Sequence, residues 1–275
     1  MVRARSASYA IRRPRRFAWR GAELIGAPRF GGAACAALGV MWLAQVSIPL
    51  TPIGRRQAGT TIVVVALVVA VGLLATAELG GRRAVAAAAG CCGLGLGAEV
   101  VGTRTGWPFG AYTYTAELAP RVFGVPAIVV VAWFGMGLPA WAVASRLVAG
   151  GGTRRVASRI GIGAVALTGW DLFLDPQMVR ERYWIWPNGG AYRGIPLSNF
   201  AGWFLVSGLL MAVLASVAPL ASPRRSLPGV YALMAAMETL GFAVFFGAPL
   251  VALCGGVVCL PLAFASLRRP RVRAT

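Results

Sequence analysis

Long apolar stretches set the strongest limit on how this chain can fold. Most of them approach the roughly 20 residues that a helix needs to cross the hydrocarbon core of a membrane. Hydrophobic residues make up 58% of the 275 residues and charged residues only 13%, a balance that a soluble domain of this size could not hide from water. We therefore expect an all-α polytopic membrane bundle of about eight transmembrane helices, with seven as the alternative count. The expected spans are 31–50, 60–79, 84–101, 125–148, 160–175, 198–219, 229–246 and 250–267.

The arginines between these stretches test the count. With the N-terminus inside, eight spans place 20 arginines in inner segments and 7 in outer ones. This asymmetry follows the positive-inside rule, whereas seven spans would put the arginine-rich C-terminal end outside. We expect a protein of the cell membrane with three parts: a basic cytoplasmic tail at 1–30, one transmembrane domain at 31–267 and a second basic cytoplasmic tail at 268–275. The arginines that orient the spans then account for the net charge of +19, the tail at 1–30 is expected to contact membrane lipid headgroups, and no nucleic-acid partner is expected.

Two residue types that carry much enzyme chemistry are missing. The chain has no histidine and no lysine, so all 27 basic residues are arginine. This excludes histidine acid–base catalysis, histidine metal ligands, a lysine Schiff base and the lysine of a phosphate-binding loop. The five cysteines lie inside apolar stretches without the spacing of a metal or redox site, so we expect them to pack between helices.

A few acidic residues fall within the expected spans, where an ionisable group is costly. Glu99 lies near the outer end of the third span. Asp171 and Asp175 lie four residues apart at the end of the fifth, which we expect Pro176 to terminate. On a helix this spacing puts both carboxyls on one face, about 6 Å apart along the axis, so the pair could provide a proton donor beside a base. The alternative is that Asp175 faces water and Asp171 meets an arginine. Glu238, in the seventh span, is either a further functional acid or the partner of an arginine.

Two loops rich in aromatic residues, 103–114 and 183–200, lie on the same outer side of this topology as Glu99 and the aspartate pair. Glycine and proline are frequent in both, which predicts fixed turns. Their tryptophans and tyrosines suit either an aromatic belt at the membrane interface or the wall of a site beside the acids. Asn199, at the start of the sixth span after Ser198, suits either a helix cap or an amide that orients a water.

A set of motifs fills the middle of the chain, roughly residues 95–205. They are Glu99 with Gly102 and Gly106, the segment 108–114 (Pro-Phe-Gly-Ala-Tyr-Thr-Tyr), 124–126, 132–133, Trp170-Asp171 through Asp175-Pro176, 184–186, 190–192, Asn199 and 202–203. Through these motifs the chain resembles the membrane carotenoid biosynthesis proteins of the carotenoid 1',2'-hydratase and bisanhydrobacterioruberin hydratase type.

This resemblance implies an enzyme that adds water across the terminal double bond of an acyclic carotenoid end group, C40 or C50, and forms a tertiary alcohol. For this reaction we expect Asp171 or Asp175 to be the proton donor and the other, with Glu99, to be the base for the water. It implies no metal and no organic cofactor, a hydrophobic carotenoid substrate, and other enzymes of the same pathway as candidate partners. The residues expected to bind substrate are Trp107, Tyr112, Tyr114, Trp170, Trp184, Trp186, Tyr192, Asn199 and Trp203.

Three other functions remain open at this point. A carotenoid end-group cyclase would use the same protonation without water. An isoprenoid transferase would use magnesium, but apart from Asp171 and Asp175 the acids are scattered singly. A proton-coupled transporter would use intramembrane acids as a relay, although the paired broken helices typical of transporters are not evident.

Overall fold

The computed structural model describes residues 31–220 and 223–270, and in this part eight helices are long and apolar enough to cross a membrane. They are α1 (Gly31–Ser47, extended by a 3-10 turn at Ile48–Leu50), α2 (Gln57–Leu79), α3 (Gly81–Thr105), α4 (Ala127–Leu147), α5 (Thr153–Arg180), α6 (Leu197–Val217), α7 (Ser226–Leu240, continued as a π-helical turn over Gly241–Phe245) and α8 (Pro249–Arg268). The predicted all-α bundle of eight spans is therefore confirmed. The expected tail at 1–30 and residues 271–275 of the second tail lie outside the described residues.

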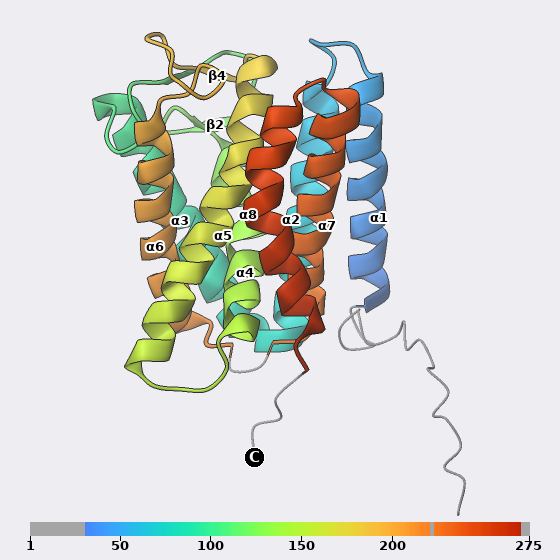
Figure 1. Ribbon diagram of the computed structural model, residues 1–275, viewed down its shortest axis with the longest axis vertical. Coiled ribbons are helices and arrows are strands. Elements are labelled where there is room, and N and C mark those ends of the chain that lie inside the picture. The colour runs from blue at the N-terminus through green and yellow to red at the C-terminus, as the bar shows by residue number, and fades with distance from the viewer. Residues whose placement is uncertain (1–30, 221–222, 271–275) are drawn as a thin grey trace, which may run out of the picture.

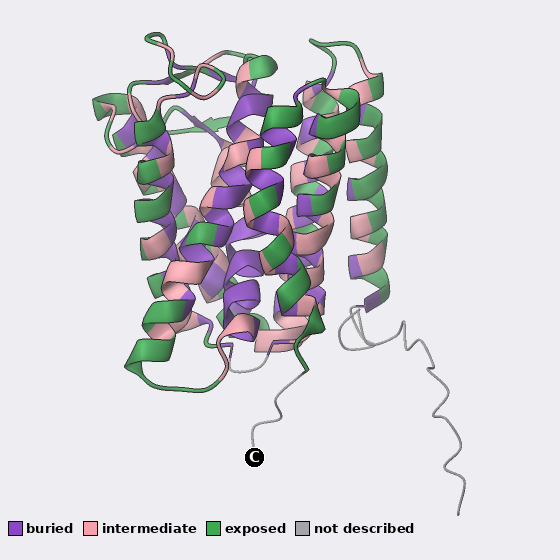
Figure 2. Ribbon diagram, in the orientation of Figure 1, coloured by how far each residue is buried: buried purple, intermediate pink, exposed green. Residues whose placement is uncertain are grey.

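Helix α4 forms the centre of the bundle and α1 its edge. In the apolar window of α4, 67% of the residues are buried inside the protein, against 17% for α1. Figure 2 shows this contrast, with buried residues concentrated along α4 and α5. Helix α1 packs chiefly against α2 at one side of the bundle (Figure 1).

The two aromatic loops lie together at one end of the bundle, as the predicted topology requires (Figure 1). Short antiparallel strands join them: β1 (Thr113–Tyr114) pairs with β4 (Trp184–Ile185), so that Tyr114 lies opposite Trp184. A second antiparallel pair, β2 (Arg121–Val122) with β3 (Val125–Pro126), lies between the first aromatic loop and α4. The α2–α3 turn and the α4–α5 loop lie at the other end of the bundle.

The expectation that Pro176 ends the fifth helix is wrong, because α5 continues through it to Arg180. A proline has no N–H to bond the carbonyl four residues earlier, which here belongs to Leu172. The hydroxyl of Tyr192 donates to that carbonyl at 3.0 Å, so the bond that proline removes is replaced from the second loop. The extra turn places Gln177 and Met178 inside the bundle.

At each end of the bundle, a buried arginine holds neighbouring segments together. At the loop end, Arg56 forms a 2.7 Å ion pair with Glu181 and donates to the carbonyl of Thr51. At the opposite end, Arg146 donates to the carbonyls of Pro223 and Ser266, each at 2.7 Å. Charge-assisted bonds of this kind are stronger than neutral ones, so each arginine ties segments that are distant in sequence.

Candidate active site

A cavity lies inside the bundle beneath the two aromatic loops. It encloses about 990 Å³ of empty space including its open mouth, and residues from α1 to α7 line it. Its wall is mostly aliphatic and aromatic, with a small number of polar side chains: Gln45, Thr60, Glu99, Asp175, Gln177, Asn199 and Glu238. An apolar chamber with a few convergent polar groups is the usual form of a small-molecule site.

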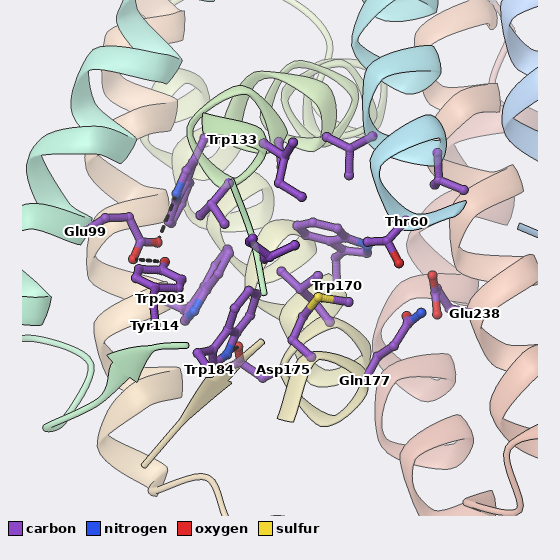
Figure 3. Close-up of a pocket in the computed structure, with 18 of the residues that line it drawn as sticks. Thr60, Glu99, Tyr114, Trp133, Trp170, Asp175, Gln177, Trp184, Trp203 and Glu238 are labelled. Carbon is purple, nitrogen blue, oxygen red and sulfur yellow. Dashed lines mark hydrogen bonds between the residues drawn. The ribbon is translucent and has the colours of Figure 1, made fainter. Parts of the chain in front are cut away.

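Glu99 is held on one side of this cavity by three donors. The hydroxyl of Tyr112 donates to Oε2, that of Tyr114 donates to the same oxygen at 2.7 Å, and Nε1 of Trp133 donates to Oε1 at 3.3 Å. Burial, and then the nearby Glu99 carboxylate, raise the pKa of Tyr112 and of Tyr114, so both hydroxyls keep their protons and remain donors. Figure 3 shows Glu99 with its hydrogen bonds to Tyr114 and Trp133 on one side of the cavity.

The local sequence explains how the first loop reaches Glu99. Helix α3 ends at Thr105, and the next residue, Gly106, has a φ of +75° that favours glycine and turns the chain back toward the helix. A β-carbon on Gly102 would lie 2.8 Å from the ring of Phe109 and 3.0 Å from the hydroxyl of Tyr112. The absence of a side chain at Gly102 therefore leaves the space in which Tyr112 approaches Glu99.

Asp171 and Asp175 form a buried pair on one face of α5. The amide of Asn199, on α6, donates to Oδ2 of both, at 3.0 Å to Asp171 and 2.5 Å to Asp175. Nε1 of Trp184 donates to Oδ1 of Asp175 at 3.1 Å. The two carboxyls therefore meet at one amide nitrogen. Asp175 lines the cavity, whereas Asp171 lies fully buried behind it.

Three tryptophans from three helices line the same cavity as Glu99 and Asp175. Trp133 of α4 and Trp203 of α6 stack with ring centroids 4.3 Å apart and planes within 16°, and Trp170 of α5 meets Trp203 edge-on at 6.3 Å. All three line the cavity. Indole faces attract positive charge, so this cluster can stabilise a cation that forms beside the acids.

Comparison with known proteins places this architecture in a family. A family profile described as "Carotenoid biosynthesis protein" matches residues 59–266, which is most of the chain. The chain belongs to the carotenoid biosynthesis protein family. It is also 36% identical over 121 residues to a bisanhydrobacterioruberin hydratase of Haloarcula japonica, in an alignment that covers 43% of this chain and 40% of that relative. No solved structure matches the chain.

The cavity of this family member brings together most of the residues that the sequence singled out. Glu99, Asp175 and Asn199 reach it, with Tyr112, Tyr114, Trp170, Trp184, Trp186 and Trp203 in its wall. Asn199 does not act as a helix cap, because α6 begins at Leu197 and the amide of Asn199 is bonded to the aspartates.

Two of the expected wall residues lie elsewhere. Trp107 is 63% exposed at the surface of the first loop and is absent from the cavity wall. Tyr192 supports α5 at the carbonyl of Leu172 and is also absent from the cavity wall. An aromatic residue in these loops therefore has three possible places: the cavity, a support for α5, or the surface.

Sequence reasoning about the site missed Trp133, Phe109 and the polar residues from α1, α2 and α5. Val129, Ala132 and Trp133 line the cavity, and their spacing of three and four residues puts them on one side of α4. An apolar helix in a membrane carries no polar face that would have marked that side. Glu238 accepts a hydrogen bond from Gln45 of α1 at 2.9 Å, and no arginine among residues 31–220 and 223–270 pairs with it.

Gly95 controls the position of Trp133, and its replacement tests how tightly this cluster is packed. A β-carbon there would lie 2.4 Å from Cδ1 of Trp133. Although alanine favours a helix over glycine by about 0.5–1 kcal/mol, overpacking costs about 1–3 kcal/mol. We expect Gly95→Ala to lower the Tm of the purified protein. Gly97→Ala on the same helix, with nothing within 4 Å, should leave the Tm unchanged or raise it.

Proposed function

We propose that this protein is a carotenoid hydratase that adds water to the terminal double bond of an acyclic end group and produces a tertiary alcohol. The observation that carries the proposal is the placement of Asp175 and Glu99 around stacked tryptophans in one apolar cavity, in a member of a carotenoid biosynthesis family. The name of the Haloarcula japonica relative supports the same reaction class.

Asp175 is the proton donor in this proposal. A protonated carboxyl in an apolar cavity can deliver its proton to the less substituted carbon of the alkene, which leaves a tertiary cation on the other carbon. Asp171 does not reach the cavity, so it acts by sharing the proton with Asp175. Asn199 fixes the orientation of both carboxyls.

Trp133, Trp203 and Trp170 shelter the cation with their ring faces until water attacks. Glu99, whose orientation is fixed by two tyrosine hydroxyls and an indole N–H, holds that water and takes its proton as the C–O bond forms. One proton enters from Asp175 and one leaves to Glu99, so the net change is the addition of one water. A proton must then return to Asp175 through solvent before the next cycle.

The experiment that tests this function is expression in a host that makes lycopene, followed by mass analysis of the pigments. Each converted end group should gain the mass of one water, and chelators should not abolish the activity in isolated membranes. Products of unchanged mass that contain rings would identify a cyclase. A requirement for magnesium and a diphosphate donor would identify a transferase.

We further propose that the protein lies in the cell membrane with both ends in the cytoplasm and the cavity end outside. The 20 to 7 distribution of arginines supports this orientation. With the native cysteines replaced, Asn188→Cys in the second aromatic loop should react with a membrane-impermeant maleimide in intact cells. Gly151→Cys, in the exposed α4–α5 loop, should react only after lysis. The reverse pattern would overturn the orientation.

A further inference from the structure

Helix α1 is a thin part of the cavity wall. Gln45 and Ile48 on one side of the helix line the cavity. On the opposite side, Val40 and Leu43 are 51% and 62% exposed, as expected of residues that face lipid on a spanning helix. One helix therefore separates this part of the cavity from the bilayer. The family match begins at residue 59, so it does not describe this helix.

The packing of α1 is one-sided. It packs closely along α2, whereas α7, which lies beside it in Figure 1, makes few contacts with either α1 or α2. Other neighbouring pairs around the cavity, such as α5 with α6 and α3 with α4, pack extensively. Since Val63 of α2 and Met234 of α7 both line the cavity, α1 completes the wall where the surrounding helices are least tightly packed.

One polar bond holds α1 to α7. Nε2 of Gln45 donates to Oε1 of Glu238 at 2.9 Å. Within residues 31–220 and 223–270, no other hydrogen bond or ion pair joins α1 to another helix. A single hydrogen bond adds little net free energy, so this one can break and re-form while α1 stays packed on α2.

A long isoprenoid substrate needs a way into the cavity from the side. The reaction proposed above takes one end group of a C40 or C50 chain into the cavity, and the rest of the chain is much longer than that end group. Hydrocarbon favours an apolar medium over water. The paired strands β1 and β4 cover the cavity at the loop end, and water lies beyond them. The apolar route therefore runs sideways, between helices.

We propose that the α1–α7 seam, where Gln45 and Ile48 meet Met234 and Glu238, is the lateral entrance through which an isoprenoid chain passes from the bilayer into the cavity. Helix α1 is its movable cover, and the Gln45–Glu238 bond is its latch. The proposal rests on the proposed function for its substrate class. On opening, α1 moves away from α7 and stays on α2. The bound chain then lies between α1 and α7 and keeps them apart.

Pulsed electron paramagnetic resonance measures this movement without the reaction. The full chain, with its native cysteines replaced, is studied in lipid nanodiscs with spin labels at exposed positions. Labels on Leu43→Cys and Leu240→Cys report the distance from α1 to α7, and labels on Leu43→Cys and Val65→Cys report that from α1 to α2. Lycopene should add a longer distance to the first pair and leave the second unchanged. Myrcene, a short acyclic terpene with the same type of terminal double bond, should change neither.

The latch is tested without any ligand. Gln45→Leu removes the donor and Glu238→Leu the acceptor, so each should raise the longer-distance population of the α1–α7 pair about fivefold, which is equivalent to about 1 kcal/mol. The α1–α2 distance should stay the same in both variants. Thr76→Val is the matched control, because its hydroxyl bonds within α2 to the carbonyl of Gly72, and it should leave both distances unchanged.

An α1–α7 distance that does not respond to lycopene would overturn the entrance, whether or not the purified protein retains the pigment. Leucine variants without a larger longer-distance population would overturn the latch. So would variants in which the α1–α2 distance broadens equally, because that result indicates a general loss of packing. A chain whose α1–α7 distance responds to lycopene but which adds no water would refute the hydratase and leave the entrance standing.

Discussion

Asp175→Asn is expected to lower the turnover of hydrated product by at least about a hundredfold, the scale of losing general acid catalysis. Asparagine keeps the volume of the side chain and can bond to Trp184, but it has no proton to give to an alkene. Asp171→Asn should produce a loss of similar size, because Asp175 then has no carboxyl with which to share its proton. Hydrated product is measured per unit of correctly inserted protein, which separates activity from expression.

The matched control for both variants is Glu117→Gln, which neutralises an exposed acid in the first loop. It should retain nearly full activity, since exposed charges contribute little. If Asp175→Asn also stays close to full activity at normal protein levels, Asp175 is not the donor, and Glu99 and Glu238 become the remaining candidates in the cavity.

Glu99→Gln should reduce turnover at least as strongly as Asp175→Asn does, for two reasons. An amide cannot accept the proton of the attacking water. Its NH₂ group would also face a donor, either a tyrosine hydroxyl or Nε1 of Trp133, and an unsatisfied buried donor costs about 1–3 kcal/mol. We therefore expect a loss of about a hundredfold or more in activity together with a lower Tm.

Tyr114→Phe separates these two effects. It removes one donor to Glu99 and leaves the carboxylate able to take a proton, so its loss of activity should be much smaller than that of Glu99→Gln. Equal losses in the two variants would mean that the geometry around Glu99, and not its basicity, is what matters.

Helix number was predictable from the sequence because the bilayer imposes a length on each apolar stretch. The proximity of the two loops followed from the same count, since an even number of spans separates residues 103–114 from 183–200. The continuation of α5 past Pro176 was not predictable, because it depends on a hydrogen bond from Tyr192, which lies in the loop after the helix. A local rule fails where a distant side chain supplies the missing bond.

The acids of the site were visible because charge is rare within spans, and Asp171 and Asp175 do share a face of α5 with Asn199 beside them. The aromatic wall was only partly visible. Trp107 and Tyr112 are five residues apart in one loop, yet one is exposed and the other buried against Glu99. Trp133 was missed because helix α4 is apolar on all sides, so only its packing against Gly95 and Trp203 shows which side faces the cavity.

The origin of the new oxygen tests the central claim most directly. Purified protein in nanodiscs is incubated with an acyclic carotenoid in oxygen-18 water, without added metal, nucleotide or oxygen, and the product is analysed by mass spectrometry. We predict that each converted end group carries one oxygen-18 atom and gains two hydrogens, and that Asp175→Asn forms almost none of this product. A product without the label, or one formed equally well by Asp175→Asn, would contradict acid-catalysed water addition in this cavity.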